Sequence, residues 1–448
     1  SPMAAIPKPD GDVRLIHDCS RPVGEAVNDY CSTDWQQKFA RVDDAAAVMT
    51  KGCFFAKVDL RSAYRSVSVS KSSQLVTGLS WDFNGETVFL KDTRLPFGAR
   101  RSVGIFHRLT QAVRRMMARK GYDLTIVYLD DFLIISEYKH ICAEALKTLI
   151  QLLRKLGFMI HWGKVIDPTT RITFLGIELD SVSMTLRLPE EKLLLLKQEL
   201  QSSLSRKRFT KRQLQSLAGR LSWAASVVKG GRVFLRRIFN TIRLLKHTTH
   251  RVRVNSEIRN DLLWWSKFIA TFNGRSAILD QRPIECVFTD ACDEGAGGSF
   301  GRDWFYFNWS QDWPQATNFH INEKEVVAVA LAAYRWAPFW RNRHIIIYSD
   351  NTVTVSALNK GSCRNDAIMK CIRSLFWLSV TYNFHLTARF LPGVQNIAAD
   401  SASRLASPGH IETLWQYTDC SPLQLHMSPK TLLFLFNRFP HWRPISQI

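Results

Sequence analysis

Apolar positions change their period along the 448-residue chain. Residues 1–187 mix short β-like apolar runs with helical stretches, which predicts a sheet with helices packed on it. The predicted strands in this part are Val67–Val69, Thr125–Leu129, Phe132–Ile135 and Thr173–Leu179. From Pro189 the pattern becomes helical, since a proline followed by two acids suits the first turn of a helix. The apolar stripe of this helix consists of Leu193, Leu196, Leu200 and Leu204.

The C-terminal part returns to shorter elements. From Cys286 the order is strand, Gly-rich turn, strand, helix, strand and helix, which is typical of a compact α/β domain. Before it, an aromatic helix around Leu262–Phe268 lies in a predicted connector, and after Arg404 the chain is irregular. Ser428 and Pro429 suit the cap of a short final helix that runs through Asn437. The predicted segments are 1–187, 188–246, 247–284, 285–405 and a tail over 406–448.

The composition excludes a disordered chain but shows an unusual charge. Hydrophobic residues make up 46% and charged residues 22%, as in ordinary globular proteins. No apolar run approaches the roughly 18 residues that a membrane span needs. However, 60 Lys and Arg face 39 Asp and Glu, which gives a net charge of +21. This excess favours a polyanionic partner, either a nucleic acid or an acidic membrane surface.

The positive charge is concentrated between Arg206 and Arg253, where the chain has no Asp or Glu. Apolar residues recur at helical spacing in this stretch, so it predicts amphipathic helices with one core face and one basic face. A solvated helix surface is one interpretation. Sequence-independent contact with a phosphate backbone explains so long a stretch without acids better. The candidate contacts are Arg206, Lys207, Arg208, Lys211, Arg212, Arg220, Arg232, Arg236 and Arg237.

The nine cysteines are scattered, their number is odd, and no CxxC pair occurs. This pattern argues against a disulfide framework and against a zinc site. A reducing intracellular compartment fits best, which means the cytoplasm, the nucleus or both. The first residues, Ser1-Pro2-Met3, are no signal peptide and do not look like a natural start, so we expect a piece of a longer polypeptide.

Two adjacent carboxylates, Asp130 and Asp131, stand between the apolar runs Leu124–Val127 and Phe132–Ile135. Strand, tight turn and strand is the natural interpretation, and it places both acids at the tip of a hairpin. Such hard anionic ligands suit Mg²⁺, which takes a few carboxylates together with water and substrate phosphates. A solvent-exposed acidic turn is the alternative, and two acids alone do not exclude it.

Further motifs surround this hairpin, and together they resemble the reverse transcriptase family over residues 1–250. Five segments carry the resemblance in family order. They are Ile6–Gly11 followed by Val13 and Arg14, then Asp59 with Tyr64, Leu95–Gly98, Tyr128–Asp131 and Phe174–Ile177. In the family these are the fingers motif, the first metal-binding motif, the LPxG motif, the YxDD box and the primer-grip turn.

The resemblance implies roles for single residues. Asp59, Asp130 and Asp131 would hold two Mg²⁺ ions, for which Mn²⁺ can substitute, at the primer 3′-hydroxyl and the leaving pyrophosphate. Lys8 and Arg14 would neutralise the triphosphate.

Five more residues belong to the implied substrate site. Tyr64 would pack under the sugar and exclude a 2′-hydroxyl, which predicts a preference for dNTPs. Phe97, beside Gly98, stands where retroviral enzymes usually have Gln, and Tyr128 opens the YxDD box. Lys164 would donate a proton to pyrophosphate, unless it is a surface lysine.

A second set of acids follows in residues 286–405: Asp290, Glu325, Asp350 and Asp400. Each stands at the end of an apolar element, where one site could collect all four, and they would repel one another unless metal ions neutralised them. Singly, each could be a helix cap or an exposed acid.

The order and spacing of these acids resemble the D-E-D-D carboxylates of the RNase H fold. Glu323 competes for the second position, but Glu325 opens the predicted helix in the better register. The family's mobile catalytic His is missing from Phe390–Gln395, and His385 stands too far back to replace it.

The resemblance therefore implies an α/β (α+β) chain with a right-hand polymerase of fingers, palm and helical thumb, a connector and an RNase H-like α/β domain. The details are most similar to DIRS-type (tyrosine-recombinase) retrotransposons, with gypsy-like elements as near neighbours, on Lys8–Gly11, Arg14–Asp18 and Leu214–Leu221.

The implied function is RNA- and DNA-directed DNA synthesis with RNase H cleavage. Its partners would be an RNA template, a DNA primer, an RNA–DNA hybrid and dNTPs. The alternatives are a domesticated or decayed nucleic-acid-binding protein without catalysis, and a polymerase with a merely structural RNase H domain.

Overall fold

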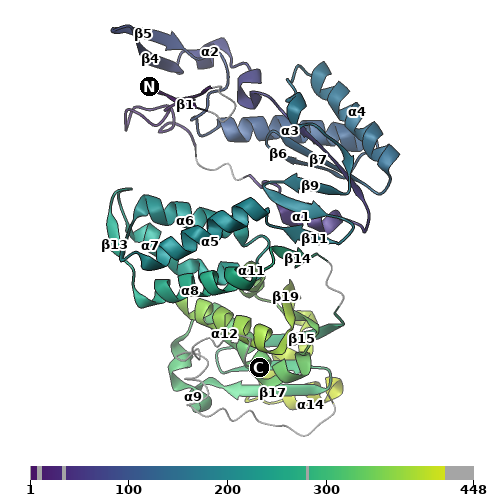
Figure 1. The fold of residues 1–448 in the computed structure, drawn as a ribbon. Helices are drawn as coiled ribbons and strands as arrows, with labels where there is room; N and C mark the ends of the chain where they lie inside the picture. Colours follow the sequence, from purple (N-terminus) through teal and green to yellow (C-terminus); the bar gives the residue numbers. More distant parts are fainter. Residues whose placement is uncertain (1, 8–12, 33–36, 279–281, 419–448) are drawn as a thin grey trace. The chain divides into compact units, whose positions relative to one another are not determined.

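The computed structural model describes residues 2–7, 13–32, 37–278 and 282–418. The chain divides into two compact units, Ser1–Glu190 with Gly274–Ile278 and Glu191–Asn273 with Leu279–Ile448 (Figure 1). This division is coarser than the five predicted segments, whose boundaries stay predictions. Lys8, Cys420 and the helix expected after Ser428 lie outside the described residues. Within the described residues, no helix has both the length and the apolar composition for crossing a membrane.

The first unit is built around an antiparallel sheet in the order β6-β7-β3-β8. Its strands are β3 (Phe54–Asp59), β6 (Thr125–Tyr128), β7 (Asp131–Ser136) and β8 (Ile166–Thr169). The amphipathic helices α3 (Ser102–Arg119) and α4 (Lys139–Lys155) pack on it and bury one apolar core with side chains such as Val58, Phe106 and Leu149. The expected strand–turn–strand around Asp130 is present as β6 and β7.

A second sheet of this unit has the order β14-β11-β10-β9. It consists of β9 (Arg171–Phe174), β10 (Ile177–Asp180), β11 (Thr185–Arg187) and β14 (Arg275–Ala277). The prediction of one strand over Thr173–Leu179 is wrong, because Leu175 and Gly176 adopt positive φ and turn the chain between β9 and β10. Val67–Val69 is not a strand either, since only Ser68 forms a bridge there, to Arg94.

The remaining elements of the first unit are short. Two hairpins are formed by β1 (Met3–Pro7) with β2 (Val13–His17), and by β4 (Gly78–Phe83) with β5 (Glu86–Lys91). The short helices are α1 (Val42–Val48), η1 (Ala63–Ser66), α2 (Lys71–Gln74) and η2 (Trp162–Lys164).

The second unit opens with helices. They are α5 (Glu190–Ser205), α6 (Lys211–Ala224), η3 (Gly231–Phe234), α7 (Arg236–Leu244) and α8 (Ser256–Thr271), with the small hairpin of β12 (Arg208–Thr210) and β13 (Arg251–Arg253). Thr210 and Gln213 form a capping box that starts α6. The predicted leucine stripe of α5 faces the core, with Leu204 half-buried and the other three leucines buried.

A five-stranded sheet in the order β17-β16-β15-β18-β19 follows. Its strands are β15 (Ile284–Ala291), β16 (Gly295–Phe300), β17 (Asp303–Asn308), β18 (His344–Ser349) and β19 (His385–Phe390). β15, β18 and β19 run parallel, whereas β16 and β17 continue the sheet antiparallel. The mixed α/β fold is confirmed, but the predicted Gly-rich turn is wrong, because Gly295–Gly298 belong to β16 and pair with both β15 and β17.

Helices connect and flank these strands (Figure 1). The longer ones are α10 (Ile321–Trp336), α11 (Thr352–Lys360) and α12 (Asp366–Tyr382). The shorter ones are α9 (Trp309–Asp312), η4 (Pro314–Asn318), η5 (Ala337–Trp340), η6 (Gly393–Gln395), α13 (Ile397–Ser403) and α14 (His410–Tyr417). Parallel strands end at one edge of a sheet, so β15 and β18 bring their carboxyl ends together.

Candidate active sites

The first acid site lies at the end of the β3–β7 pair. Asp59 is the last residue of β3 and stands opposite Asp131, the first residue of β7. Leu129 and Asp130 form the connecting turn, in which Leu129 has a φ of 53° that side chains other than Gly rarely adopt. The Leu60 amide donates to the Asp130 carbonyl at 3.2 Å, which ties the turn to β3. Asp59, Asp130 and Asp131 are therefore neighbours, as the sequence predicted.

Two lysines balance the charge of these acids. Lys57 Nζ lies 3.1 Å from Asp131 Oδ1, and Lys164 Nζ lies 3.1 Å from Asp59 Oδ1. Burial raises the pKa of Asp131, and Lys57 acts against this rise. The carboxylates are hard oxygen donors that suit Mg²⁺. With Lys164 on Asp59 and Lys57 on Asp131, bound metal ions would have to replace these ammonium groups.

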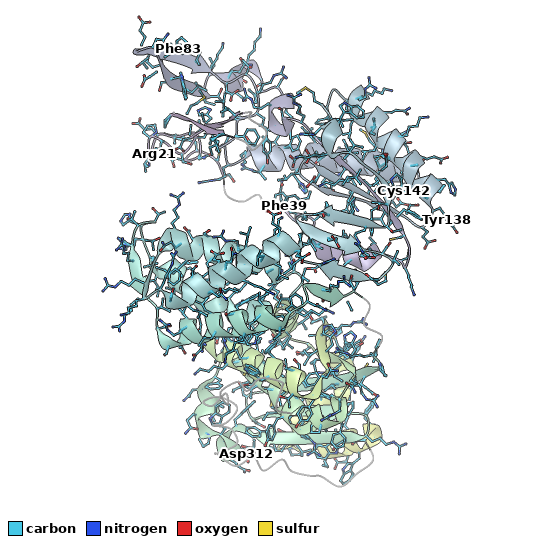
Figure 2. The ribbon with its side chains drawn as sticks, viewed as in Figure 1. Arg21, Phe39, Phe83, Tyr138, Cys142 and Asp312 are labelled. Carbon is cyan, nitrogen blue, oxygen red and sulfur yellow. The ribbon has the colours of Figure 1, made fainter. Side chains whose placement is uncertain are left out.

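Aromatic side chains surround this hairpin. The Tyr64 ring in η1 meets the edges of Phe97 at 4.7 Å and Phe106 at 5.1 Å between centroids. Burial raises the pKa of Tyr64, and the nearby charges of Asp130 and Tyr128 raise it further. Phe39, which is labelled in Figure 2, was not singled out by the sequence. Its ring centroid lies 5.9 Å from that of Tyr128. No local pattern marks it, because it comes from a segment more than 80 residues earlier in the chain.

The structure says less about the residues assigned to the triphosphate and pyrophosphate than about the acids. Lys8 is outside the described residues, and Arg14 lies in β2 opposite Ile6. Lys164 is in η2, and its side chain is 54% exposed although it reaches Asp59. The proton-donor role predicted for Lys164 stays a prediction.

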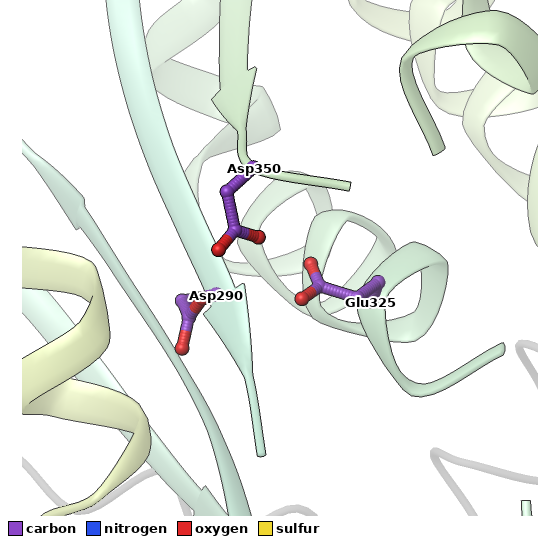
Figure 3. Close-up of side chains that lie close together, drawn as sticks. All are labelled: Asp290, Glu325 and Asp350. Atoms are coloured by element: carbon purple, nitrogen blue, oxygen red, sulfur yellow. The ribbon is translucent and has the colours of Figure 1, made fainter. Parts of the chain in front are cut away.

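The second acid site lies at the carboxyl ends of β15 and β18 (Figure 3). Asp290 is in β15, Asp350 follows β18 directly, and Glu325 projects from α10. Ligand oxygens of these three acids all lie within 4.8 Å of one another. Among the described residues, this is the one group of three acidic, His or Cys side chains with such spacing. Two of its members are nearly enclosed, with Asp290 4% and Glu325 3% exposed.

Burial and mutual repulsion make this site unfavourable for three negative charges. Burial raises the pKa of Glu325 to about 9, and Asp290 and Asp350 add to the rise. Burial likewise raises the pKa of Asp290 to about 6, although the Ser403 hydroxyl donates to its Oδ2 at 2.6 Å. A divalent cation would supply the missing positive charge, so the donor set fits such an ion.

Asp400, the fourth predicted acid, is outside this close group. It lies in α13, and Arg404 Nε contacts its Oδ1 at 2.8 Å. Its charge nevertheless contributes to the raised pKa of Asp290, so it is near. The structure thus brings three of the four predicted acids into contact range and places the fourth beside them.

The competing acid Glu323 has a different task. Its Oε2 accepts from the His320 amide at 3.1 Å, which completes the capping box of α10. The prediction that Glu325 opens the helix is wrong, because α10 begins at Ile321 and Glu325 lies in its second turn. Glu325 still is the acid that joins Asp290 and Asp350.

The loop that was expected to carry a catalytic His comes close to the acids. A Cβ on Gly393 would stand 2.9 Å from Asp350 Oδ2, so this position lies against the site and has little room. His385 is the first residue of β19 and pairs with His344, the first residue of β18. Asp350 follows the other end of β18. His385 therefore lies away from the acids.

The basic segment separates into exposed and internally paired residues. Arg206, Lys207, Arg208, Arg212 and Arg220 are exposed, and Lys211, Arg232, Arg236 and Arg237 are half-buried. Arg220 also contacts Glu199 at 2.6 Å. The Lys211 ammonium donates to the Leu245 carbonyl, and burial lowers the pKa of Arg236.

Arg237 belongs to a buried ion-pair network that the sequence did not predict. It contacts Glu257 and Asp261, each at 3.1 Å. Asp261 is 1% exposed and also accepts two hydrogen bonds from Arg373 of α12, at 3.0 and 3.2 Å. Arg373 comes from 112 residues later, so no local pattern could reveal the pair.

Comparisons with known proteins identify the first part of the chain. Residues 6–179 match the family model of reverse transcriptase (RNA-dependent DNA polymerase). The chain is 23% identical to the enzymatic polyprotein of cauliflower mosaic virus (strain Strasbourg) over 367 residues, which cover 78% of this chain and 50% of that polyprotein. The chain thus spans about half the length of this curated relative.

Two further similarities are more limited in extent or identity. The Gag-Pol polyprotein of koala retrovirus is 27% identical over 126 residues, 28% of this chain and 8% of that polyprotein. The foamy viral protease–reverse transcriptase dRH, solved in complex with double-stranded DNA, has a TM-score of 0.50 at 18% identity. That match covers 87% of this chain and 65% of the foamy viral chain, and it concerns the fold.

Proposed function

We propose that the chain copies retroelement RNA into DNA, because residues 6–179 match the reverse transcriptase family model and the chain is similar to a viral enzymatic polyprotein. It would also copy DNA templates and cleave the RNA strand of RNA–DNA hybrids with its second acid site. The observation that carries the polymerase proposal is the pairing of Asp59 with Asp131 at one hairpin end, inside the matched residues. We also propose the finer assignment to a DIRS-type or gypsy-like element, and an intracellular location.

In the polymerase site, Asp59, Asp130 and Asp131 would hold the two Mg²⁺ ions. When bound, these ions lower the pKa of the primer 3′-hydroxyl and stabilise the charge of the leaving pyrophosphate. Lys164 is more than half exposed, so its ammonium can exchange Asp59 for an anionic phosphate. Tyr64, packed against Phe97 and Phe106, would face the sugar of the incoming dNTP.

In the second site, Asp290, Glu325 and Asp350 would hold the cations for hydrolysis of the RNA strand. Asp400 would complete the site once its carboxylate is released from the ion pair with Arg404. The support is the close approach of these three carboxylates. Within the described residues, no ion pair balances their charges, whereas Asp400 is paired with Arg404. Metal binding at such a site would offset the burial and the repulsion that together raise the pKa of Glu325.

The exposed arginines and lysines between Arg206 and Arg220 would contact the phosphates of template and primer. These contacts carry no sequence information, which suits a polymerase that must hold any sequence. The foamy viral protein of similar fold was solved with double-stranded DNA, which supports a duplex as the ligand.

Two substitutions test the proposal together. Asp131→Asn should lower primer extension on an RNA template with Mg²⁺ by at least about 100-fold and leave cleavage of a labelled RNA–DNA hybrid unchanged. Asp350→Asn should do the reverse. The exposed acids Asp43 and Glu412 offer matched controls, Asp43→Asn and Glu412→Gln, which should retain both activities. If both test variants kept both activities, the assignment of the two sites would be wrong.

The same assays separate the alternatives. Hybrid binding without extension or cleavage by the wild-type chain would indicate a non-catalytic nucleic-acid-binding protein. Extension without cleavage would indicate a structural second domain. The position of Gly393 against Asp350, in a loop without His, favours this second alternative over the first.

A further inference from the structure

The Leu95–Gly98 loop is held by residues from near the start of the chain. The His17 amide donates to the Phe97 carbonyl at 2.9 Å, and Asn28 Nδ2 donates to the Gly98 carbonyl at 2.9 Å. The Arg100 amide donates to Asn28 Oδ1 at 2.7 Å. Gly98 has a φ of +116°, and a Cβ there would stand 1.9 Å from the His17 carbonyl oxygen. The loop backbone is therefore fixed at Phe97, Gly98 and Arg100, and only glycine fits at position 98.

Asn28 is the side chain that joins these contacts. It is 5% exposed, and its amide also donates to Ser20 Oγ at 2.8 Å. Both donor hydrogens and the acceptor oxygen of the side chain are thus used, and the three partners fix the orientation of the amide. A buried and fully satisfied amide of this kind is rigid, and losing it leaves backbone groups without partners.

The loop that Asn28 holds carries Phe97, whose ring meets the Tyr64 ring at 4.7 Å and an interplanar angle of 84°. Tyr64 also meets Phe106, which is fully buried in α3. Phe106 is part of the helix core, whereas Phe97 belongs to the loop that Asn28 holds. The orientation of the Tyr64 ring therefore depends on that loop.

We infer that Asn28 is a positioning residue for sugar selection, because it fixes the Phe97 ring that orients Tyr64 against the 2′-position of the incoming nucleotide. This inference rests on the proposed polymerase function. Without the Asn28 amide, the 97–100 backbone gains freedom and the Phe97 ring moves away from Tyr64. Tyr64 then excludes a ribose less strictly, because a displacement of about 1 Å already changes such a contact strongly.

Two substitutions at Asn28 in the full chain distinguish the hydrogen bonds that its side chain donates from the one that it accepts. Asn28→Asp keeps an acceptor for the Arg100 amide and loses both donors, and Asn28→Leu loses all three bonds at similar volume. We expect the ratio of kcat/KM for dNTP over that for the matching rNTP to fall about tenfold in Asn28→Asp and further in Asn28→Leu. If Asn28→Leu does not fold, Asn28→Asp alone decides the question.

A double-substitution cycle shows whether Asn28 acts through Tyr64. Tyr64→Ala should lower the dNTP/rNTP ratio more than either Asn28 variant, and adding Asn28→Asp to it should lower the ratio no further. Asn359→Asp is the matched control, because that amide also holds a backbone segment, the Ala388 amide and carbonyl, but in the second unit. It should leave the sugar ratio unchanged.

Hydrogen exchange measures the loop itself without any catalysis. The Arg100 amide should exchange faster in Asn28→Leu than in the wild type, while amides of β7 remain protected. Faster exchange with an unchanged sugar ratio would overturn the role in sugar selection. Unchanged exchange would overturn the role in holding the loop. A wild-type chain that extended no primer would overturn the proposed function, and the sugar-selection role with it.

Discussion

The two acid sites balance their negative charge in different ways. In the first unit, Lys57 and Lys164 each stand 3.1 Å from one of the carboxylates at the hairpin. In the second unit, no ion pair among the described residues reaches Asp290, Glu325 or Asp350, whose oxygens lie within 4.8 Å of one another. The first site carries its own counter-charges, and the second compensates by holding a proton, since burial raises the pKa of Glu325 to about 9.

This difference predicts a different relation between metal ions and stability. A cation that enters the first site must replace ammonium groups, so part of its binding energy is lost. A cation that enters the second site replaces a proton and relieves repulsion, so its binding adds to the stability of the folded unit. Divalent ions should therefore stabilise the second unit more than the first.

The largest expected effect comes from Glu325→Gln in the presence of a chelator. The carboxyl has a pKa of about 9 when folded and an ordinary value of 4.5. Between these values the folded state holds a proton that the unfolded state has released, so stability falls as pH rises, by at most about 1.4 kcal/mol per pH unit. Glu325→Gln removes this penalty. The free energy of unfolding should therefore rise by several kcal/mol at pH 8 and hardly at pH 4.

Urea unfolding in chelator and in Mg²⁺ checks this prediction, with Glu412→Gln as an exposed control. Mg²⁺ should stabilise the wild type and lose most of that effect in Glu325→Gln. Equal stability of wild type and variant at pH 8 in chelator would show that burial and the neighbouring acids do not penalise the charged form of Glu325 as the structure indicates.

A smaller effect is expected from Lys57→Met at the first site. Burial raises the pKa of Asp131 and Lys57 counteracts it, so removal of the lysine raises this pKa further. The proposed polymerase reaction needs the ionised carboxylate, so the acidic limb of the pH profile of primer extension should move upward by about one pH unit. Lys57→Arg keeps the charge and should keep the profile. An unmoved acidic limb in Lys57→Met, with hybrid cleavage intact, would show that the lysine does not tune Asp131.

The sequence predicted those parts of the fold and the site that depend on local order. Strand, turn and strand around Asp130 follow from two apolar runs, and Asp290 and Asp350 meet because each ends one of two parallel strands. The start of α10 was misplaced, since His320 is an unusual capping residue, and its box with Glu323 is recognised only in three dimensions.

Contacts between segments that are far apart in the chain could not be predicted from the sequence. Lys57 reaches Asp131 across β3 and β7, Asn28 reaches Gly98 over 70 residues, and Arg373 reaches Asp261 over 112. Such pairs depend on how the elements pack, which no period or spacing in one sequence reveals. They are also the contacts that decide how charge is balanced at each site.

The smallest expected effect concerns the basic segment, where the same distinction between balanced and unbalanced charge applies. Arg212 is exposed, whereas Arg237 is engaged by Glu257 and Asp261 at 3.1 Å. If Arg212 contacts one phosphate, Arg212→Gln should weaken duplex binding less than tenfold. It should also reduce the slope of log K against log salt concentration by about 0.9.

Arg237→Gln should leave that slope unchanged, because the charge of Arg237 is already neutralised within the protein. It should instead lower the free energy of unfolding, since Asp261 loses one of its two arginine partners in a buried place. Binding titrations at several salt concentrations compare the two variants. They are carried out at a temperature below the unfolding midpoint of each variant. Equal slopes for both variants would mean that internal ion pairing does not decide which of these arginines meets the nucleic acid.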